Sequence, residues 1–579
     1  MMFCLDDGAE LLYGPAAMDE SATAIISETG AILGGFPANE SPTRSQIKTT
    51  DQTAIFRTGA ESKPHGHLGN SSEKQSHSAK SVAAPQSKRY GLLAIFSVAV
   101  LVIVAGFLGY RYLKPAGTEQ INSIAVLPFE NRSSNADSEY LSDGLSDSLI
   151  FRLTQLPNLK VSPTSSVIRY KGQQTNVAEI ARELEVDAVM SGKLAQRGGD
   201  LTISVELIDA RTRKLIWAEQ YDRKMTDLLA TQREIATTIA QKLQLKLAGS
   251  ETGGITKKYT DNNEAYQLYL KGRFHFAKRT KDDVLKSINY FQQAINLDPS
   301  FAIAYARMAE SYNQMPAYPY LSPKEAFPQA KAAAQRGLEI DPALAEGHAA
   351  LANTLAAYDW NWAEAETEFK RALELDPNSS STHFRYGLTM GAVGRLEEGI
   401  TEVKRALELE PLDLSMNANL AWAYLTARQF DSALDQAKKA HDLDQDFVVG
   451  RWNLSQAYIA KGMYTEAIEL NEQSLQASPT SQFALRDAGY AYAKSGRHQE
   501  ANEKINRFRE IAKTQYVMSC RIASIYGALG ERDKAFAELE RAFENRDWDV
   551  HRLKVDPFMD PLRDDPRYAK LLRRLNLPE

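Results

Sequence analysis

Cysteine is scarce in this chain of 579 residues, which contains only Cys4 and Cys520. Two thiols so far apart form no C-x-x-C pair and no disulfide framework. Charge of one sign is not in large excess either, because the formal net charge is -6 and no run of Lys and Arg is long enough to follow a phosphate backbone. We therefore expect neither a cysteine-based fold nor nucleic-acid binding.

Motifs for catalysis and nucleotide binding are also missing. The sequence contains no G-x-x-x-x-G-K-[ST], G-x-G-x-x-G, G-x-S-x-G or H-E-x-x-H motif, and its nine histidines are scattered. His65 and His67 stand close together, but two ligands in a segment without periodicity do not make a metal site. We expect no enzymatic activity, no cofactor and no small-molecule substrate.

One long hydrophobic run stands out near the N-terminus. Residues 90–110 carry no charge between Arg89 and Arg111, and a helix of this length rises about 31 Å, enough to cross the hydrocarbon core of a bilayer. Four Lys and Arg residues precede the run closely and two follow it. This bias predicts a bacterial inner-membrane protein with a single transmembrane helix, a cytoplasmic N-terminus and periplasmic C-terminal domains.

The residues before this run fall into two parts. Residues 14–88 are rich in Ser, Thr, Ala, Gly and Pro without apolar periodicity, which is typical of a disordered linker. Residues 1–13 resemble the second half of a small zinc ribbon, with Cys4 as a ligand, Asp7 in place of the second cysteine, and Gly8 at the turn. A structural zinc site needs four ligands, so zinc is expected only if a C-x-x-C pair exists upstream.

A compact α/β pattern extends over residues 122–247. Ile124–Leu127 is a short apolar run suited to a buried strand, and apolar residues alternate with polar ones over 201–207, as in a sheet with one buried face. The expected strands are residues 124–127, 159–167, 187–194, 201–207 and 214–223, and the expected helices are 140–156, 177–186 and 225–247.

The order of the sequence blocks in this region resembles the TolB-like amino-terminal domain of bacterial signalling proteins. The blocks are IAVLPFENRSS near the start, RYKG at 169–172, VAEIARELEVDAVMSGKL, and VELIDARTRKLIWAEQYDR. The resemblance implies an extracytoplasmic, non-enzymatic domain and carries over no catalytic residue. The polar cluster Ser142-Asp143-Gly144 is therefore expected to begin a helix, with Ser and Asp as caps, rather than to form a site.

Proline recurs on a 34-residue period in the second half of the chain, at Pro377, at Pro411 and, after one missed position, at Pro479. Small residues recur at fixed offsets before each of these positions. The pattern resembles the tetratricopeptide (TPR) repeat, in which each unit is a pair of helices. We expect about eight units over residues 263–545, and a C-terminal cap over residues 546–579 that covers the last apolar face.

Alignment with the repeat family places several polar and aromatic residues at exposed positions of the inner helices, on the concave face. They are Asn353, Trp422, Trp452, Gln456, Arg486 and Tyr490. Aromatic residues and arginine dominate binding hot spots, so this set predicts a site for a protein or peptide partner. The alternative is that the aromatic residues only pack between neighbouring repeats.

Taken together, these patterns predict a multidomain chain with a disordered N-terminal arm, one transmembrane helix, a small α/β (TolB-like) domain and an all-α TPR solenoid. The leading hypothesis is a membrane-anchored scaffold that presents the TPR array to protein partners outside the cytoplasm. The alternative is the sensory or regulatory half of a transmembrane signalling protein, related to kinase, cyclase or transcription-regulator architectures. Its N-terminal effector would then be missing or lie upstream.

Overall fold

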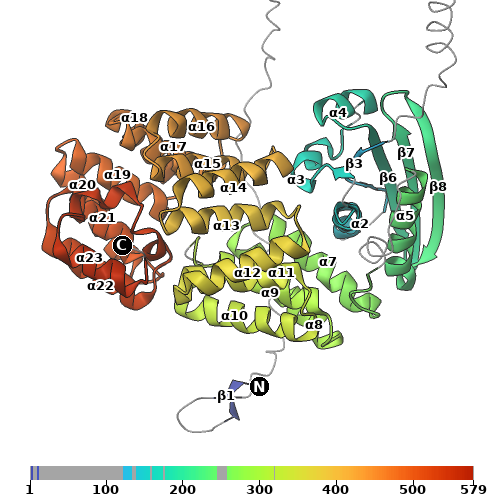
Figure 1. The fold of residues 1–579 in the computed structure, drawn as a ribbon, viewed down its shortest axis with the longest axis horizontal. Helices are drawn as coiled ribbons and strands as arrows, with labels where there is room; N and C mark the ends of the chain where they lie inside the picture. Colours follow the sequence, from blue (N-terminus) through green and yellow to red (C-terminus); the bar gives the residue numbers. More distant parts are fainter. Residues whose placement is uncertain are drawn as a thin grey trace, which may run out of the picture. The chain divides into compact units, whose positions relative to one another are not determined.

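The computed structural model describes residues 2–3, 10–11, 121–133, 138–156, 159–173, 176–243, 257–318 and 320–577. The chain divides into two compact units, Met1–Ala105 and Gly106–Glu579. In the first unit, β1 (Met2–Phe3) and β2 (Glu10–Leu11) form a two-stranded antiparallel sheet. The second unit contains a small domain with a mixed sheet, followed by a mostly helical solenoid (Figure 1).

The membrane localisation expected from the sequence is wrong. Within the described residues, no helix is both long enough and apolar enough to cross a bilayer. The longest of these helices, α10 (Pro323–Ile340), carries lysine, arginine and glutamate side chains. The hydrophobic run at 90–110 lies outside the described residues, as do the expected linker at 14–88 and the ribbon-like positions Cys4 and Asp7.

A mixed sheet forms the centre of the α/β domain. Its strands run in the order β5-β3-β6-β7-β8, with β3 parallel to β5 and β6, and with β6, β7 and β8 antiparallel. The strands are β3 (Ser123–Val126), β4 (Glu130–Asn131, paired with β6), β5 (Lys160–Val161), β6 (Ala188–Arg197), β7 (Asp200–Asp209) and β8 (Lys214–Lys224). Every residue of β3 is buried, and buried residues alternate along β7, so both apolar patterns predicted these strands correctly.

The helices of this domain depart from expectation in two places. They are α2 (Glu139–Thr154), α3 (Thr164–Val167), α4 (Val177–Glu183) and α5 (Leu228–Lys242), with 3₁₀ turns η3 (Ile168–Tyr170) and η4 (Met225–Asp227). The strand expected over 159–167 is largely wrong: after β5 the chain turns into α3, because Pro163 cannot donate to a sheet and Ser and Thr favour helix starts. Ser142-Asp143-Gly144 begins no helix, since α2 already begins at Glu139.

In the described part of the chain, the solenoid consists of eight consecutive helix pairs. The pairs are α7 (Asn263–Ala277) with α8 (Lys281–Leu297), α9 (Ala302–Gln314) with α10, α11 (Ala345–Thr354) with α12 (Trp362–Leu375), α13 (Ser380–Ala392) with α14 (Leu396–Leu409), α15 (Leu414–Thr426) with α16 (Phe430–Leu443), α17 (Val448–Ala460) with α18 (Tyr464–Ala477), α19 (Gln482–Lys494) with α20 (His498–Ile511), and α21 (Ser519–Ala528) with α22 (Arg532–Asn545). Small residues allow the close approach within a pair. A Cβ on Gly387 would lie 2.7 Å from the carbonyl oxygen of Gly399, and a Cβ on Gly399 would lie equally close to the carbonyl oxygen of Gly387. The backbones of α13 and α14 can therefore approach this closely because both positions are glycine.

The third pair contains one residue more than the period allows, and the structure shows where it goes. After α11 the chain forms a π-helical turn, η5 (Leu355–Asp359), which holds one more residue per hydrogen bond than an α-helix. Trp360 then adopts a left-handed conformation with φ 56°. The next helix, α12, therefore begins at Trp362 with the 34-residue register restored.

The C-terminal residues do more than cap the last pair. We call residues 546–577 the tail; it contains the 3₁₀ turns η6 (Trp548–Arg552) and η7 (Pro557–Leu562) and the helix α23 (Pro566–Arg574). Trp548 stacks on Phe327 of the second pair with ring centroids 5.9 Å apart. Trp362 of the third pair donates a hydrogen bond to the carbonyl of Leu575 at 2.9 Å. The tail thus packs on the last repeats and also reaches back to early ones.

The α/β domain and the first helix pairs share one hydrophobic core. Helix α2 packs on α7, where a Cβ on Gly144 would lie 3.1 Å from the side chain of Leu270. The Tyr266 hydroxyl lies 2.8 Å from Ser148 Oγ and donates to Gln232 Oε1 at 2.6 Å. One continuous cluster of buried side chains runs from the sheet into α12. These parts are therefore packed as a single body.

Candidate interaction groove

Five of the six residues predicted for the concave face lie on three successive inner helices. They are Trp422 on α15, Trp452 and Gln456 on α17, and Arg486 and Tyr490 on α19. We call these five residues the groove cluster. With its amide oriented to suit its neighbours, Gln456 accepts hydrogen bonds from Arg486 Nη2 at 2.7 Å and from the Trp452 indole N–H. Neighbouring repeats are thus linked through this amide.

Asn353, the sixth predicted residue, lies elsewhere. It is half-buried on α11, two inner helices before Trp422. Within the described residues it takes no part in the hydrogen bonds, ion pairs and ring contacts that join the groove cluster. The candidate site is therefore confined to the fifth, sixth and seventh helix pairs, with a contribution from the eighth.

The tail covers the groove cluster. The guanidinium of Arg552 lies 4.9 Å from the ring centroid of Trp422 and 5.7 Å from that of Trp452. The ring of Phe558 meets Tyr490 edge to face at 4.8 Å, and Arg486 lies over the same Phe558 ring at 4.2 Å. As a result Trp422, Gln456, Arg486 and Tyr490 are each at most 6% exposed. The aromatic residues therefore contact a peptide segment, and that segment belongs to the same chain.

An ion-pair network lies beneath these contacts. Asp549 of the tail accepts a hydrogen bond from Arg521 Nε of α21 at 2.9 Å and another from Arg552. Burial opposes ionisation of Asp549, but Arg521, Arg552 and Arg486 together hold its pKa well below the usual range. On the inner-helix side, Arg486 Nε donates to Asp487 at 2.7 Å. Buried charges of both signs are thus paired where the tail meets the groove.

Asp547 lies at the edge of this network and differs from Asp549. Its carboxyl group accepts hydrogen bonds from the Tyr516 hydroxyl at 2.6 Å and from the Cys520 backbone N–H at 3.2 Å. Burial raises the pKa of Asp547 to about 7, and the nearby charge of Asp549 adds to the effect. Burial also raises the pKa of the Cys520 thiol well above its usual value, so this cysteine is a packing residue that stays protonated.

Several residues of the site were not predicted. Arg521 lies 34 residues after Asp487 and therefore occupies the same position in the next repeat. The periodicity could thus have placed Arg521 on an inner helix beside the site. Asp549, Arg552 and Phe558 had no such signal, because the tail has no repeat and its contacts join distant parts of the sequence. Their pairing with the groove depends on tertiary packing alone.

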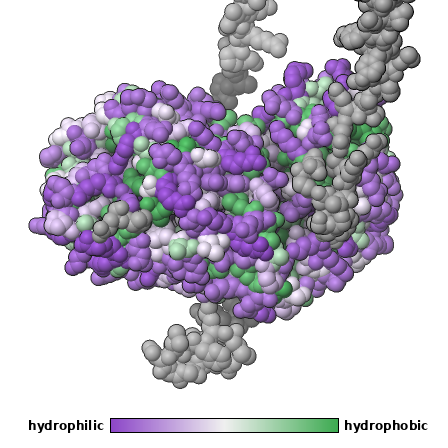
Figure 2. Space-filling model, viewed as in Figure 1, coloured by the Kyte–Doolittle hydropathy of each residue, from purple (hydrophilic) through white to green (hydrophobic). Residues whose placement is uncertain are grey.

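The exposed surface shown in Figure 2 is mainly hydrophilic, and the hydrophobic residues there form small separate patches. Large contiguous apolar patches are what mark the binding surfaces of many proteins. On the face shown, therefore, the surface itself does not reveal a partner site. The groove cluster, which the tail covers, is the more informative feature.

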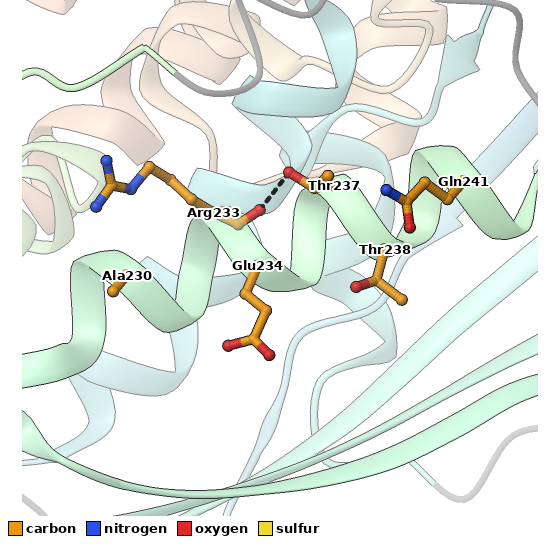
Figure 3. A pocket seen from close by; sticks show the side chains of 6 residues that line it. All are labelled: Ala230, Arg233, Glu234, Thr237, Thr238 and Gln241. Atoms are coloured by element: carbon orange, nitrogen blue, oxygen red, sulfur yellow. Dashed lines mark hydrogen bonds between the residues drawn. The ribbon is translucent and has the colours of Figure 1, made fainter.

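A separate concavity of about 470 Å³ lies along α5 (Figure 3). It is lined by Ala230, Arg233, Glu234, Thr237, Thr238 and Gln241. All six residues belong to one helix, and Thr237 Oγ1 donates within that helix to the Arg233 carbonyl at 2.8 Å. Glu234 and Thr238 point to the same side, away from the Arg233 guanidinium. These side chains do not converge, so the concavity is a weaker candidate than the groove.

Comparison with known families identifies two parts of the chain. Residues 119–238 match the second domain of HilA/YgeH-like transcriptional regulators. Residues 450–481 and 518–546 match the tetratricopeptide repeat. The TolB-like resemblance of the α/β domain stays a prediction, because the family that matches this region is a different one.

Two curated proteins are similar to parts of this chain. The chain is 29% identical over 239 residues to the putative adenylate cyclase 3 of Rhizobium meliloti (strain 1021), which covers 40% of each chain. It is 24% identical over 308 residues to the transcriptional regulator HilA of Salmonella typhimurium, covering 50% of this chain and 53% of the regulator. The chain therefore spans about half or less of the length of these relatives.

Solved structures of TPR proteins also resemble parts of the chain. The thermophilic TPR protein TTC0263 of Thermus thermophilus is 18% identical, with a TM-score of 0.29, and the match covers 34% of this chain and 99% of that one. The pilF protein of Pseudomonas aeruginosa is 21% identical, also with a TM-score of 0.29, covering 38% and 94%. The family match at residues 450–481 and 518–546, together with the eight helix pairs, identifies the helical half of this chain as a solenoid with tetratricopeptide repeats.

Proposed function

We propose that this protein is a non-enzymatic scaffold for protein–protein interaction, in which the TPR solenoid binds a segment of a protein partner in its groove. The observation that carries this proposal is the groove cluster, in which two tryptophans, a tyrosine and an arginine from three inner helices already hold a peptide segment. Aromatic residues and arginine supply most of the binding energy in protein interfaces. The shared core joins the α/β domain to the first three helix pairs of the same solenoid.

A second candidate is the regulatory half of a signalling protein. It is supported by the similarity to a putative adenylate cyclase and to a transcriptional regulator, both of which match over a substantial part of this chain. In this candidate, the α/β domain and the solenoid receive a protein signal and pass it to an effector domain. The scaffold remains the first choice, because it requires only the groove that the structure describes.

Site-specific photo-crosslinking in the full chain tests the scaffold proposal. A photoreactive amino acid replaces Trp452, which is half-buried in the groove, or Arg507, which is exposed on the outer helix α20. In cells that produce the protein, we expect reproducible crosslinks to a partner at position 452 but not at position 507. The crosslinks at 452 should disappear when Arg486→Ala is added. Equal crosslinking at both positions, or none at 452, would overturn the proposal.

A further inference from the structure

The tail enters the groove with three different side chains that anchor it. Asp549 supplies a carboxylate to Arg521, Arg552 places a guanidinium on two tryptophan rings, and Phe558 supplies a ring to Tyr490. In chain order these are an acidic residue, a basic residue three positions later and an aromatic residue six positions after that. Each anchor matches the chemistry of its contact, because guanidinium groups bind carboxylates and the faces of aromatic rings.

This fit leaves buried donors without acceptors. Arg521 is 2% exposed, yet its Nη1 and Nη2 atoms find no hydrogen-bond partner among the described residues, and neither does Nε of Arg552. Among the described residues, Nε is the one Arg521 nitrogen with an acceptor, a single oxygen of Asp549, and the guanidinium also lies 4.1 Å from the ring centroid of Phe483. A carboxylate presented side-on would pair with two nitrogens of a guanidinium at once. The tail therefore uses only part of the binding capacity of the groove.

The part of the tail inside the groove is a loop held at both ends. It begins after α22, and it is followed by α23, whose Arg567 and Arg574 pair with Asp533 and Glu540 of α22. A segment tethered in this way has a high effective concentration at its own site, even when its intrinsic affinity is modest. A free peptide must therefore compete with it.

We propose that the groove is a binding site for a partner segment of acidic–basic–aromatic character, and that residues 547–562 of the tail occupy it as an intramolecular competitor. This inference rests on the proposed function, since it names the chemistry of the protein partner. The inner helices offer Arg486 and Arg521 against the single carboxylate of Asp487, so an acidic anchor suits the groove. Two tryptophan faces suit a cation, and Tyr490 suits an aromatic ring.

The test uses a fluorescent peptide of residues 546–562 added to the full chain and followed by anisotropy. In the unmodified protein the tail holds the groove, so the apparent affinity should be low. Phe558→Ala in the chain weakens the tail and frees the groove, and the apparent affinity should rise about tenfold or more, since it scales with the fraction of open sites. Adding Tyr490→Ala to Phe558→Ala should abolish this gain. Lys570→Ala, on the exposed side of α23, is the matched tail control and should change nothing.

A milder variant keeps the proposal testable if Phe558→Ala unfolds the protein. Asp560→Ala removes the ion pair with Arg428, which has a 2.7 Å separation and lies at the exposed rim of the groove. We expect a two- to threefold rise in apparent affinity with the helical circular dichroism unchanged. Folded variants that bind the peptide no better than the unmodified chain would overturn the proposal and make the tail a permanent part of the core. Dimerisation of the variants without peptide binding would also overturn it, because a second copy would then fill the groove.

The two proposals fail in distinguishable ways. Peptide binding without partner crosslinks at position 452 would leave the site intact but remove the scaffold function. Crosslinks at 452 without peptide binding would leave the scaffold function intact but overturn the proposed chemistry of the partner segment.

Discussion

Trp362 and Leu575 are joined by a hydrogen bond across 213 positions of the sequence, from the indole N–H to the backbone carbonyl at 2.9 Å. Trp362 begins the second helix of the third repeat, and Leu575 directly follows the last helix of the chain. Beside this bond, Asn576 donates a second hydrogen bond to the carbonyl of Trp360. The end of the tail is thus attached to the place where the third repeat accommodates its extra residue.

Trp362→Phe should loosen the end of the tail. The substitution keeps an aromatic ring but removes the donor, and the carbonyl of the fully buried Leu575 loses this partner, at a cost of about 1 kcal/mol. Hydrogen exchange should become faster over residues 566–577. Trp217→Phe, which removes an indole hydrogen bond within β8, is the control and should leave exchange in the tail unchanged. Equal protection of the tail in both variants would show that the bond contributes nothing.

Gly387→Ala should be strongly destabilising, whereas Gly391→Ala on the same helix should not. A Cβ at 387 would lie 2.7 Å from the Gly399 carbonyl, so α13 and α14 would have to separate, at a cost of about 2–4 kcal/mol. A Cβ at 391 meets nothing within 4 Å, and alanine favours the helix by up to about 1 kcal/mol. Urea unfolding of the two variants provides the comparison. Similar midpoints for both would contradict the close packing of this pair.

Asp547 should make the protein less stable as the pH rises. Its folded pKa of about 7 lies above the value of about 3.9 in an unfolded chain, so the folded state keeps a proton that the unfolded state has lost. Its contribution to stability is present below about pH 4 and is lost as the pH rises through 7, by at most about 1.4 kcal/mol per pH unit. Asp547→Asn should remove this dependence. The measurement is the free energy of unfolding of both proteins from pH 4.5 to 8; parallel curves would contradict the assignment.

His551 should have the opposite effect. It lies in the tail against Trp548, with ring centroids 4.8 Å apart, and burial together with Arg552 lowers its pKa to about 3. An unfolded histidine takes up a proton near pH 6.5, so its stabilising contribution is present above that pH and is lost as the pH falls toward 3. Between pH 7.5 and 5, the unmodified protein should lose about 2 kcal/mol more than His551→Gln. Equal losses would show that the ring is protonated in the folded state.

The repeats could be predicted from the sequence because each helix pair depends on local rules. Small residues such as Gly387 mark the close contacts, and the period places Trp422, Trp452 and Tyr490 on inner helices. The alternation along β7 similarly predicted a strand, because successive side chains point to opposite faces of a sheet. In each case the sequence pattern and the contacts that it predicts fall within the same few dozen residues.

Two of the wrong predictions have a physical explanation. One involves contacts between residues far apart in the sequence, and the other involves a segment whose proline and hydroxyl residues oppose its apolar pattern. The tail was expected only to cover the last repeat, because nothing in its sequence shows that Trp548 stacks on Phe327. Pro163 and the hydroxyl residues after it prevailed over an apolar pattern that indicated a strand. The membrane expectation rested on hydropathy at 90–110, and no described helix is able to span a bilayer. The packing of the tail depends on tertiary structure, which the periodicity of a single sequence does not specify.

The core that joins the α/β domain to the first helix pairs has a consequence for how the molecule melts. Leu270 packs against Gly144, and Tyr266 forms hydrogen bonds with both Ser148 and Gln232. The α/β domain and the first helix pairs therefore each bury part of their apolar surface only against the other. Heating should therefore denature the sheet and the early repeats in one calorimetric transition. Cutting the chain between them would leave each fragment with an aggregation-prone apolar face, so the natural limit of independent folding lies farther along the solenoid.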